Sequence, residues 1–127
     1  MNKKILIIDD DQNFRQLMSV FLSESGFEVD SADSGREGVK KALSMRPDLV
    51  LLDYNLGDMN GHDAAFWIKN MAATRAIPII VLSAAASDPS LSQGLLTAKA
   101  CKSVLSKTLA LESMLLEIIR VLELKSG

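Results

Sequence analysis

The chain has 127 residues, of which 48% are hydrophobic and 24% charged, and its net charge is −2. This length fits one domain with its own hydrophobic core, and the slightly acidic charge argues against direct nucleic-acid binding. One cysteine excludes an intramolecular disulfide, and no apolar run approaches the roughly 18 residues of a membrane span. We therefore expect a single cytoplasmic domain over residues 1–127, with no output domain.

The chain opens with a short apolar strand that runs into acidic residues. Residues 5–8 are all aliphatic, and Asp9, Asp10 and Asp11 follow directly. Apolar residues at helical spacing come next, with Asp11 placed to cap a helix and Gly26 placed to end it. The pattern predicts a central strand followed by an amphipathic helix.

A second strand and helix are predicted directly after this. The strand covers residues 27–31. Ser34 and Glu37 have the spacing of a capping box, which opens a helix that runs to about residue 45. Pro47 prevents this helix from continuing.

The strand that leads to Asp53 is the most informative stretch. Four apolar residues, 49–52, run straight into Asp53, and a turn rich in Gly, Asp and Asn follows. This pattern is typical of a strand that is buried on both faces and ends where an open parallel sheet binds its ligands. Asn60 is then placed to cap a helix over residues 61–72, with Trp67 on its apolar face.

The last part of the chain predicts two more strands and two helices. Residues 77–82 form a buried strand that leads to Ser83, and residues 87–101 form a short or irregular helix. An edge strand over residues 102–106 and a helix over residues 109–124 complete the pattern. Five strands alternating with five helices predict an α/β fold with a doubly wound parallel sheet.

Polar residues of a consistent kind follow the predicted strand ends. These are Asp9 and Asp10 after the first strand, Asp53 after the third, Ser83 after the fourth and Lys107 after the fifth. Three carboxylates at one edge repel one another and raise one another's pKa values, a conflict that a divalent cation removes. Mg²⁺ prefers oxygen ligands, and a lysine and a hydroxyl that face it suggest a bound anion, for which phosphate is the simplest candidate.

At these residues the chain resembles the response-regulator receiver domains of two-component signalling. The similarity covers essentially the whole chain, and each motif gains its specificity from the order of all of them. The residues that carry it are Ile7-Ile8-Asp9-Asp10, Pro47-Asp48 to Asp53, Met59-Asn60-Gly61, Pro78 to Ser83-Ala84, and Lys107. The resemblance implies a flavodoxin-like sheet with strand order 2-1-3-4-5.

The resemblance also implies how a phosphoryl group would be held. Asp53 would accept it from a histidine kinase or phosphotransfer protein, and Ser83 and Lys107 would bind its oxygens. A carboxylate nucleophile of this kind forms an acyl phosphate. No enzymatic activity is implied beyond self-phosphorylation from a phosphodonor and autodephosphorylation.

The metal ligands are implied in the same way. Asp10 and Asp53 would hold Mg²⁺ directly, Asp9 would act through water, and the backbone carbonyl of Asn55 would be a further ligand. Phosphoryl transfer depends on such charge neutralisation and positioning more than on covalent help from the protein.

The chain departs from the usual family pattern in several places. Gly57 stands where proline is common, Val104 where Tyr or Phe is usual, and Thr108 where proline is usual. The segment between Ser83 and Lys107 is about two residues longer than usual. Because Val104 cannot supply a rotating aromatic ring, we expect the signalling switch to run through a backbone shift of residues 84–92.

The final helix predicts a partner surface. Leu116 and Leu124 project from its polar side, so we expect them to join the fifth strand in a partner contact or a phosphorylation-dependent homodimer. Its buried face is predicted to contain Leu111, Met114, Leu115, Ile118, Ile119, Val121 and Leu122.

Two other functions are compatible with parts of the pattern. The acidic run from Asp9 to Asp11 superficially matches the nucleophile motif of haloacid-dehalogenase-type phosphohydrolases, which also use Mg²⁺. However, Gln12 and Asn13 stand where that family has a small residue and Thr or Val, and the chain has no cap insert. A pseudo-receiver that serves only as an interaction module would have lost Asp10, Asp53 or Lys107, and all three are present.

Overall fold

A computed structural model describes residues 2–83 and 101–126 of the chain. Its parallel sheet has five strands in the order β2-β1-β3-β4-β5, which confirms the predicted α/β fold and strand order. The predicted helix over residues 87–101, apart from Cys101, and the predicted shift of residues 84–92 lie outside the described residues. The elements are β1 (Lys4–Ile8), α1 (Gln12–Glu24), β2 (Glu28–Ala32), α2 (Gly35–Met45), β3 (Leu49–Asp53), α3 (Gly61–Lys69), β4 (Ile79–Ser83), β5 (Ser103–Ser106) and α5 (Leu111–Ser126).

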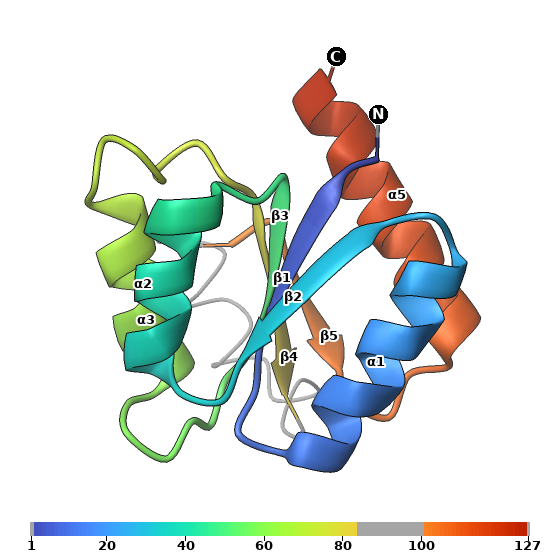
Figure 1. Ribbon diagram of the computed structural model, residues 1–127, viewed down its shortest axis with the longest axis horizontal. Coiled ribbons are helices and arrows are strands. Elements are labelled where there is room, and N and C mark those ends of the chain that lie inside the picture. The colour runs from blue at the N-terminus through green and yellow to red at the C-terminus, as the bar shows by residue number, and fades with distance from the viewer. Residues whose placement is uncertain (1, 84–100, 127) are drawn as a thin grey trace.

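Helices cover both faces of the sheet. Helices α2 and α3 lie side by side on one face, and α1 and α5 lie on the other (Figure 1). All strand pairs described are parallel, so the carboxyl ends of the strands meet at one edge. That edge carries the predicted site residues.

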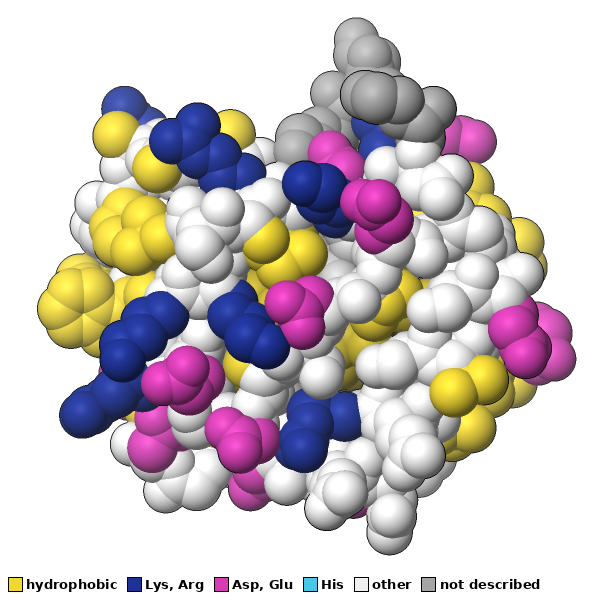
Figure 2. Space-filling view, in the orientation of Figure 1, with side chains coloured by type: hydrophobic (Ala, Val, Ile, Leu, Met, Phe, Trp, Pro, Cys, Tyr) yellow, Lys and Arg dark blue, Asp and Glu magenta, His cyan; other side chains and the backbone are white. Residues whose placement is uncertain are grey.

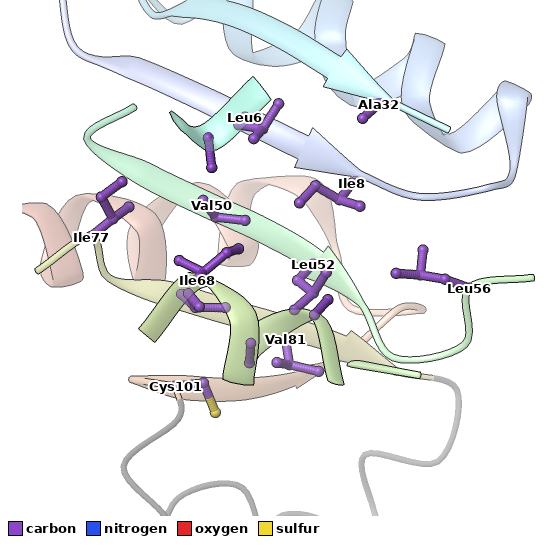
Figure 3. Close-up of a cluster of buried hydrophobic side chains, with 14 residues drawn as sticks. Leu6, Ile8, Ala32, Val50, Leu52, Leu56, Ile68, Ile77, Val81 and Cys101 are labelled. Carbon is purple, nitrogen blue, oxygen red and sulfur yellow. The ribbon is translucent and has the colours of Figure 1, made fainter. Parts of the chain in front are cut away.

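Alternation along the strands divides the core into two halves. Leu6, Ile8, Val50, Leu52 and Val81 point toward α2 and α3, and Figure 3 shows them with Ile68 of α3 and the buried Cys101. The neighbouring strand residues pack under α1 and α5. At roughly 1.5–3 kcal/mol for each fully buried aliphatic side chain, these two layers supply the main driving force for folding. This second half contains Ile5, Ile7, Leu49, Leu51, Ile80, Leu82, Met18, Leu22, Met114, Ile118, Val121 and Leu122.

The predicted caps set the helix starts. Asp11 accepts hydrogen bonds from the backbone N–H groups of Asn13 and Phe14, and Ser34 accepts one from Glu37. Each cap satisfies donors that the first turn of a helix leaves without partners. At the other end of α1, Gly26 has a φ of +100°, a backbone conformation that favours glycine.

Several element ends differ from the prediction by one to three residues. β2 lies one residue later than expected, and β4 begins at Ile79. Helix α3 ends at Lys69, because the Lys69 ammonium and the Thr74 hydroxyl donate to nearby carbonyl groups and turn the chain before Ile77. Helical periodicity does not show such contacts between a side chain and a carbonyl group six or eight residues away.

Two residues predicted on apolar helix faces are more exposed than core residues. Trp67, expected in the core or at its half-buried flank, is 54% exposed, and Ala64, Ala65 and Ile68 form the buried stripe of α3. Ile119 of α5 is 38% exposed and lies at the margin of a narrower stripe than predicted. Leu116 is 69% exposed, as predicted, and the side chain of Leu124 lies outside the described residues. No helix in the described part of the chain is long and apolar enough to cross a membrane.

We predict that Gly38→Ala destabilises the protein. A Cβ atom at Gly38 would stand 2.4 Å from Cδ1 and 2.8 Å from Cγ2 of Ile8, which is fully buried, so α2 must move away from the sheet. Such overpacking costs about 1–3 kcal/mol, more than the roughly 1 kcal/mol that alanine gains in helix propensity. The free energy of unfolding in urea measures the effect. Ser44→Ala, on the exposed side of α2, is the matched control, and a stabilised Gly38→Ala variant would contradict the close packing.

Candidate functional site

Three carboxylates meet at the carboxyl edge of the sheet. Asp9 and Asp10 follow β1, and Asp53 ends β3. One oxygen from each lies within 4.8 Å of the others. Asp9 and Asp53 are buried, at 1% and 6% exposure, whereas Asp10 is open to solvent. The prediction that these acids lie together is therefore confirmed in geometry.

Lys107 completes the cluster from β5. Its ammonium nitrogen lies 2.9 Å from Asp9 Oδ2 and 3.5 Å from Asp53 Oδ2. Its backbone N–H donates to the carbonyl of Ser83, so the turn after β5 is tied to the end of β4. Burial acts to lower the pKa of Lys107, but the hydrogen bond from Lys107 to Asp9 and the charges of Asp9 and Asp53 raise it overall. Lys107 is thus held as a cation beside both buried acids.

Asp9 is fixed by several backbone contacts. Its Oδ1 accepts a hydrogen bond from the backbone N–H of Asp11 at 2.9 Å, and its backbone carbonyl accepts one from Arg15 at 2.7 Å. Its Oδ2 is buried and has no hydrogen-bond partner among the described residues, although the Lys107 ammonium stands near it. That close approach is an ion pair. Three carboxylates with oxygens this close together offer the ligands that a hard cation prefers.

The environment of Asp53 disfavours its charged form. Burial and then the charge of Asp9 raise the pKa of Asp53 to about 6, and Asp10 adds to the rise. The Lys107 charge and a hydrogen bond from the backbone N–H of Asn55 act in the opposite direction. The predicted mutual rise of pKa among the acids is confirmed for Asp53. An additional cation at this edge would relieve the repulsion.

The remaining predicted residues lie beside this cluster. Ser83 is buried at the end of β4, at 1% exposure. Asn55 is exposed, and its described polar contact to the acids is through the N–H group, so the predicted use of its carbonyl as a metal ligand stays a prediction. The structure therefore brings Ser83 and Asn55 to the same edge as the acids.

Sequence reasoning missed three residues around the site. The ring of Phe14 lies under Lys107, with 4.8 Å between the ammonium and the ring centroid. Arg15 donates to Asp9, and Asp58 accepts hydrogen bonds from the backbone N–H groups of Gly35 and Arg36 at the start of α2. The positions of Phe14 and Arg15, one turn after the Asp11 cap, could have indicated that they lie near the site. No local sequence pattern pairs Asp58 with the start of a helix 22 residues earlier.

Comparison with protein-family models decides the class. The model of the response regulator receiver domain matches residues 5–119, which is most of the chain. The chain belongs to this family. Receiver domains are the phosphate-accepting signalling domains of two-component systems, so the predicted family and function class are confirmed.

Curated relatives of this receiver domain include transcriptional regulators. The alkaline phosphatase synthesis transcriptional regulatory protein PhoP of Bacillus subtilis is 36% identical over 84 residues, which are 66% of this chain and 34% of the relative. The probable transcriptional regulatory protein SilR of Salmonella typhimurium is 40% identical over 81 residues, 64% of this chain and 35% of the relative. The chain therefore spans about a third of the length of these relatives.

A solved structure agrees over nearly the whole receiver domain. The chemotaxis protein CheY4 of Vibrio cholerae superposes with a TM-score of 0.89 at 29% identity, and the match covers 95% of this chain and 99% of that one. The match supports the same arrangement of strands and helices in a protein whose length is close to that of this chain.

The raised pKa of Asp53 predicts a pH effect on the stability of the metal-free receiver domain. The folded state binds this proton more tightly than the unfolded state, so the contribution of Asp53 to stability falls as pH rises from about 4 through about 6. Asp53→Asn removes this titration. The free energy of unfolding of Asp53→Asn minus that of the wild type should therefore be larger at pH 7.5 than at pH 4, by on the order of 1–3 kcal/mol.

Urea unfolding in EDTA at the two pH values measures this difference. Asp33→Asn, which changes an exposed acid just after β2, is the control and should show a smaller change. If the difference in unfolding free energy between Asp53→Asn and the wild type does not vary with pH, Asp53 is not buried against the other acids.

Proposed function

We propose that this receiver domain accepts a phosphoryl group on Asp53 from a histidine kinase or phosphotransfer protein. The observation that carries the proposal is the buried carboxylate of Asp53 at the end of β3, with the Lys107 ammonium 3.5 Å away and two further acids beside it. A carboxylate in this setting has a neighbouring cation to stabilise added phosphate charge.

The proposed transfer uses one oxygen of Asp53 as the nucleophile. This oxygen bonds to phosphorus while the P–N bond of the phosphohistidine donor breaks, and the imidazole nitrogen keeps the electron pair and takes up a proton. The ammonium of Lys107 pairs with one phosphoryl oxygen, and the hydroxyl of Ser83 donates to another. Asp9 holds Lys107 in place through the ion pair at 2.9 Å.

The metal proposal rests on the same cluster. Asp10 and Asp53 would hold Mg²⁺ directly, Asp9 would act through water, and the Asn55 carbonyl would be a further ligand. The bound ion would neutralise charge on the carboxylates and on the transferred phosphoryl group. The three clustered carboxylates of Asp9, Asp10 and Asp53 support a cation at this place.

The proposal includes a cytoplasmic location and a partner surface. The single cysteine, Cys101, is a buried free thiol, which suits a reducing, cytoplasmic environment. The chain spans about a third of the length of its curated relatives. A partner contact or phosphorylation-dependent homodimer through Leu116, Leu124 and the fifth strand stays a prediction.

Phosphorylation of Asp53 is directly testable. Incubation with Mg²⁺ and phosphoramidate should add the mass of one phosphoryl group to the wild type and none to Asp53→Ala, and hydroxylamine should release it as expected for an acyl phosphate. Asp33→Asn should be labelled like the wild type. Equal labelling of Asp53→Ala would place the acceptor elsewhere, and an unlabelled wild type would favour the interaction-only alternative.

The metal proposal has its own test. Asp10→Asn should weaken Mg²⁺ binding by roughly tenfold or more, because it removes one of few direct protein ligands. Titration calorimetry of wild type, Asp10→Asn and the control Asp33→Asn measures the change. An unchanged affinity in Asp10→Asn would move the metal away from this cluster.

A further inference from the structure

A groove lies between α2 and α3, on the opposite side of the sheet from α5. It has a volume of about 270 Å³. Figure 2 shows hydrophobic side chains next to Lys and Arg side chains on this side of the molecule, with Asp and Glu side chains among them. The groove is lined by Arg36, Val39, Lys40, Met59 and Trp67.

Two aromatic side chains of α3 stand in solvent beside this groove. Phe66 is 60% exposed and Trp67 is 54% exposed, and their rings make an edge-to-face contact with 6.3 Å between centroids. Single exposed leucines are ordinary on a protein surface, but adjacent exposed Phe and Trp rings are not needed for this fold, whose core beneath α3 is made by smaller residues. Tryptophan is also among the residues that contribute most to binding at interfaces.

The charge of the groove is positive. Arg36 and Lys40 line it, and none of its lining residues in the described part of the chain is acidic. Lys40 makes an ion pair with Glu37 at 3.6 Å, but both side chains are more than half exposed, so this pair contributes little and leaves the ammonium available. The charge of Arg36 acts on Asp58. The hydrogen bonds that Asp58 accepts come from the backbone N–H groups of Gly35 and Arg36, so they do not use the Arg36 guanidinium.

The floor of the groove is fixed before any partner binds. Met59 packs against Gly35 so closely that a Cβ atom there would stand 2.5 Å from Met59 Cγ. Asp58, its neighbour, holds the start of α2 through hydrogen bonds of 2.9 and 3.0 Å. A preformed groove reduces the ordering cost of binding.

We propose that this groove docks an acidic segment of a partner protein, with an apolar side chain of that segment packed against Trp67. Carboxylates of the segment pair with Arg36 and Lys40, and its apolar side chain covers Val39, Met59 and the indole ring. The assignment rests on the charge and apolar content of the lining, and it is independent of phosphorylation at Asp53.

Selection from a displayed library of random peptides tests the docking site. The bait is the complete 127-residue chain, so that α2 and α3 keep their native support. Peptides selected against it should be enriched in Asp and Glu together with Phe, Trp or Leu. Trp67 is the only tryptophan of the chain, so binding of a selected peptide that lacks tryptophan should shift its emission to the blue as the ring loses water.

Matched variants locate the binding. Trp67→Ala should weaken the binding of a selected peptide by roughly tenfold or more, as expected for an aromatic residue at the centre of an interface. Arg36→Glu combined with Lys40→Glu should weaken it by a similar factor and reduce its salt dependence. Val20→Ala and Lys3→Glu change an exposed valine and an exposed lysine elsewhere and should leave the affinity unchanged. Circular dichroism checks that each variant is folded.

The proposal is overturned if selection yields no binders or if the selected peptides are basic. It is also overturned if the peptides bind without changing Trp67 emission, or if Trp67→Ala leaves their affinity unchanged.

Two other occupants are excluded or identified by the same variants. Sedimentation that shows self-association lost in Trp67→Ala would assign the groove to a second copy of the chain. Binding to phosphatidylglycerol vesicles, but not to phosphatidylcholine vesicles, that is lost in Trp67→Ala would assign it to a membrane surface. Either result would replace the acidic protein segment as the occupant.

Discussion

The ion pair between Lys107 and the buried carboxylate of Asp9 is the interaction on which the active edge depends. Two acids buried within a few ångströms of each other are unfavourable on their own, because both desolvation and repulsion oppose their charged forms. The Lys107 ammonium stands 2.9 Å from Asp9 and 3.5 Å from Asp53, so a single cation stabilises the charged forms of both carboxylates. It reaches them only because β5 is placed beside β4 at the edge of the sheet. The parallel strand order is therefore also an electrostatic requirement, since it delivers acids from β1 and β3 and a base from β5 to one place.

Sequence reasoning succeeded where the deciding interactions are local or periodic. Asp11 and Ser34 cap their helices through bonds that span two or three residues, and the four apolar residues before Asp53 are typical of a strand covered on both faces. The three acids and Lys107 were placed together because parallel strands share an edge, which follows from topology alone. These features account for the fold class and for most of the candidate site.

The failures have physical causes beyond local sequence. Trp67 was expected in the core or at its half-buried flank, yet it is 54% exposed, because the fully buried positions of α3 are taken by Ala64, Ala65 and Ile68. The contact of Phe14 with Lys107 joins residues from opposite ends of the chain, and its existence depends on where β5 ends. The contacts of residues at such junctions depend on neighbours that are distant in the sequence, and neither secondary-structure propensity nor hydrophobic periodicity describes these neighbours.

The carboxylate of Asp58 joins two parts of the chain that would otherwise open separately. It belongs to the turn just after β3, but its hydrogen bonds go to the first amides of α2. Displacement of that turn would strip the first turn of α2 of two of its hydrogen bonds and withdraw Met59 from Gly35 at the same time. The turn and the start of the helix thus form one cooperative unit for local unfolding, with a single opening free energy shared between them.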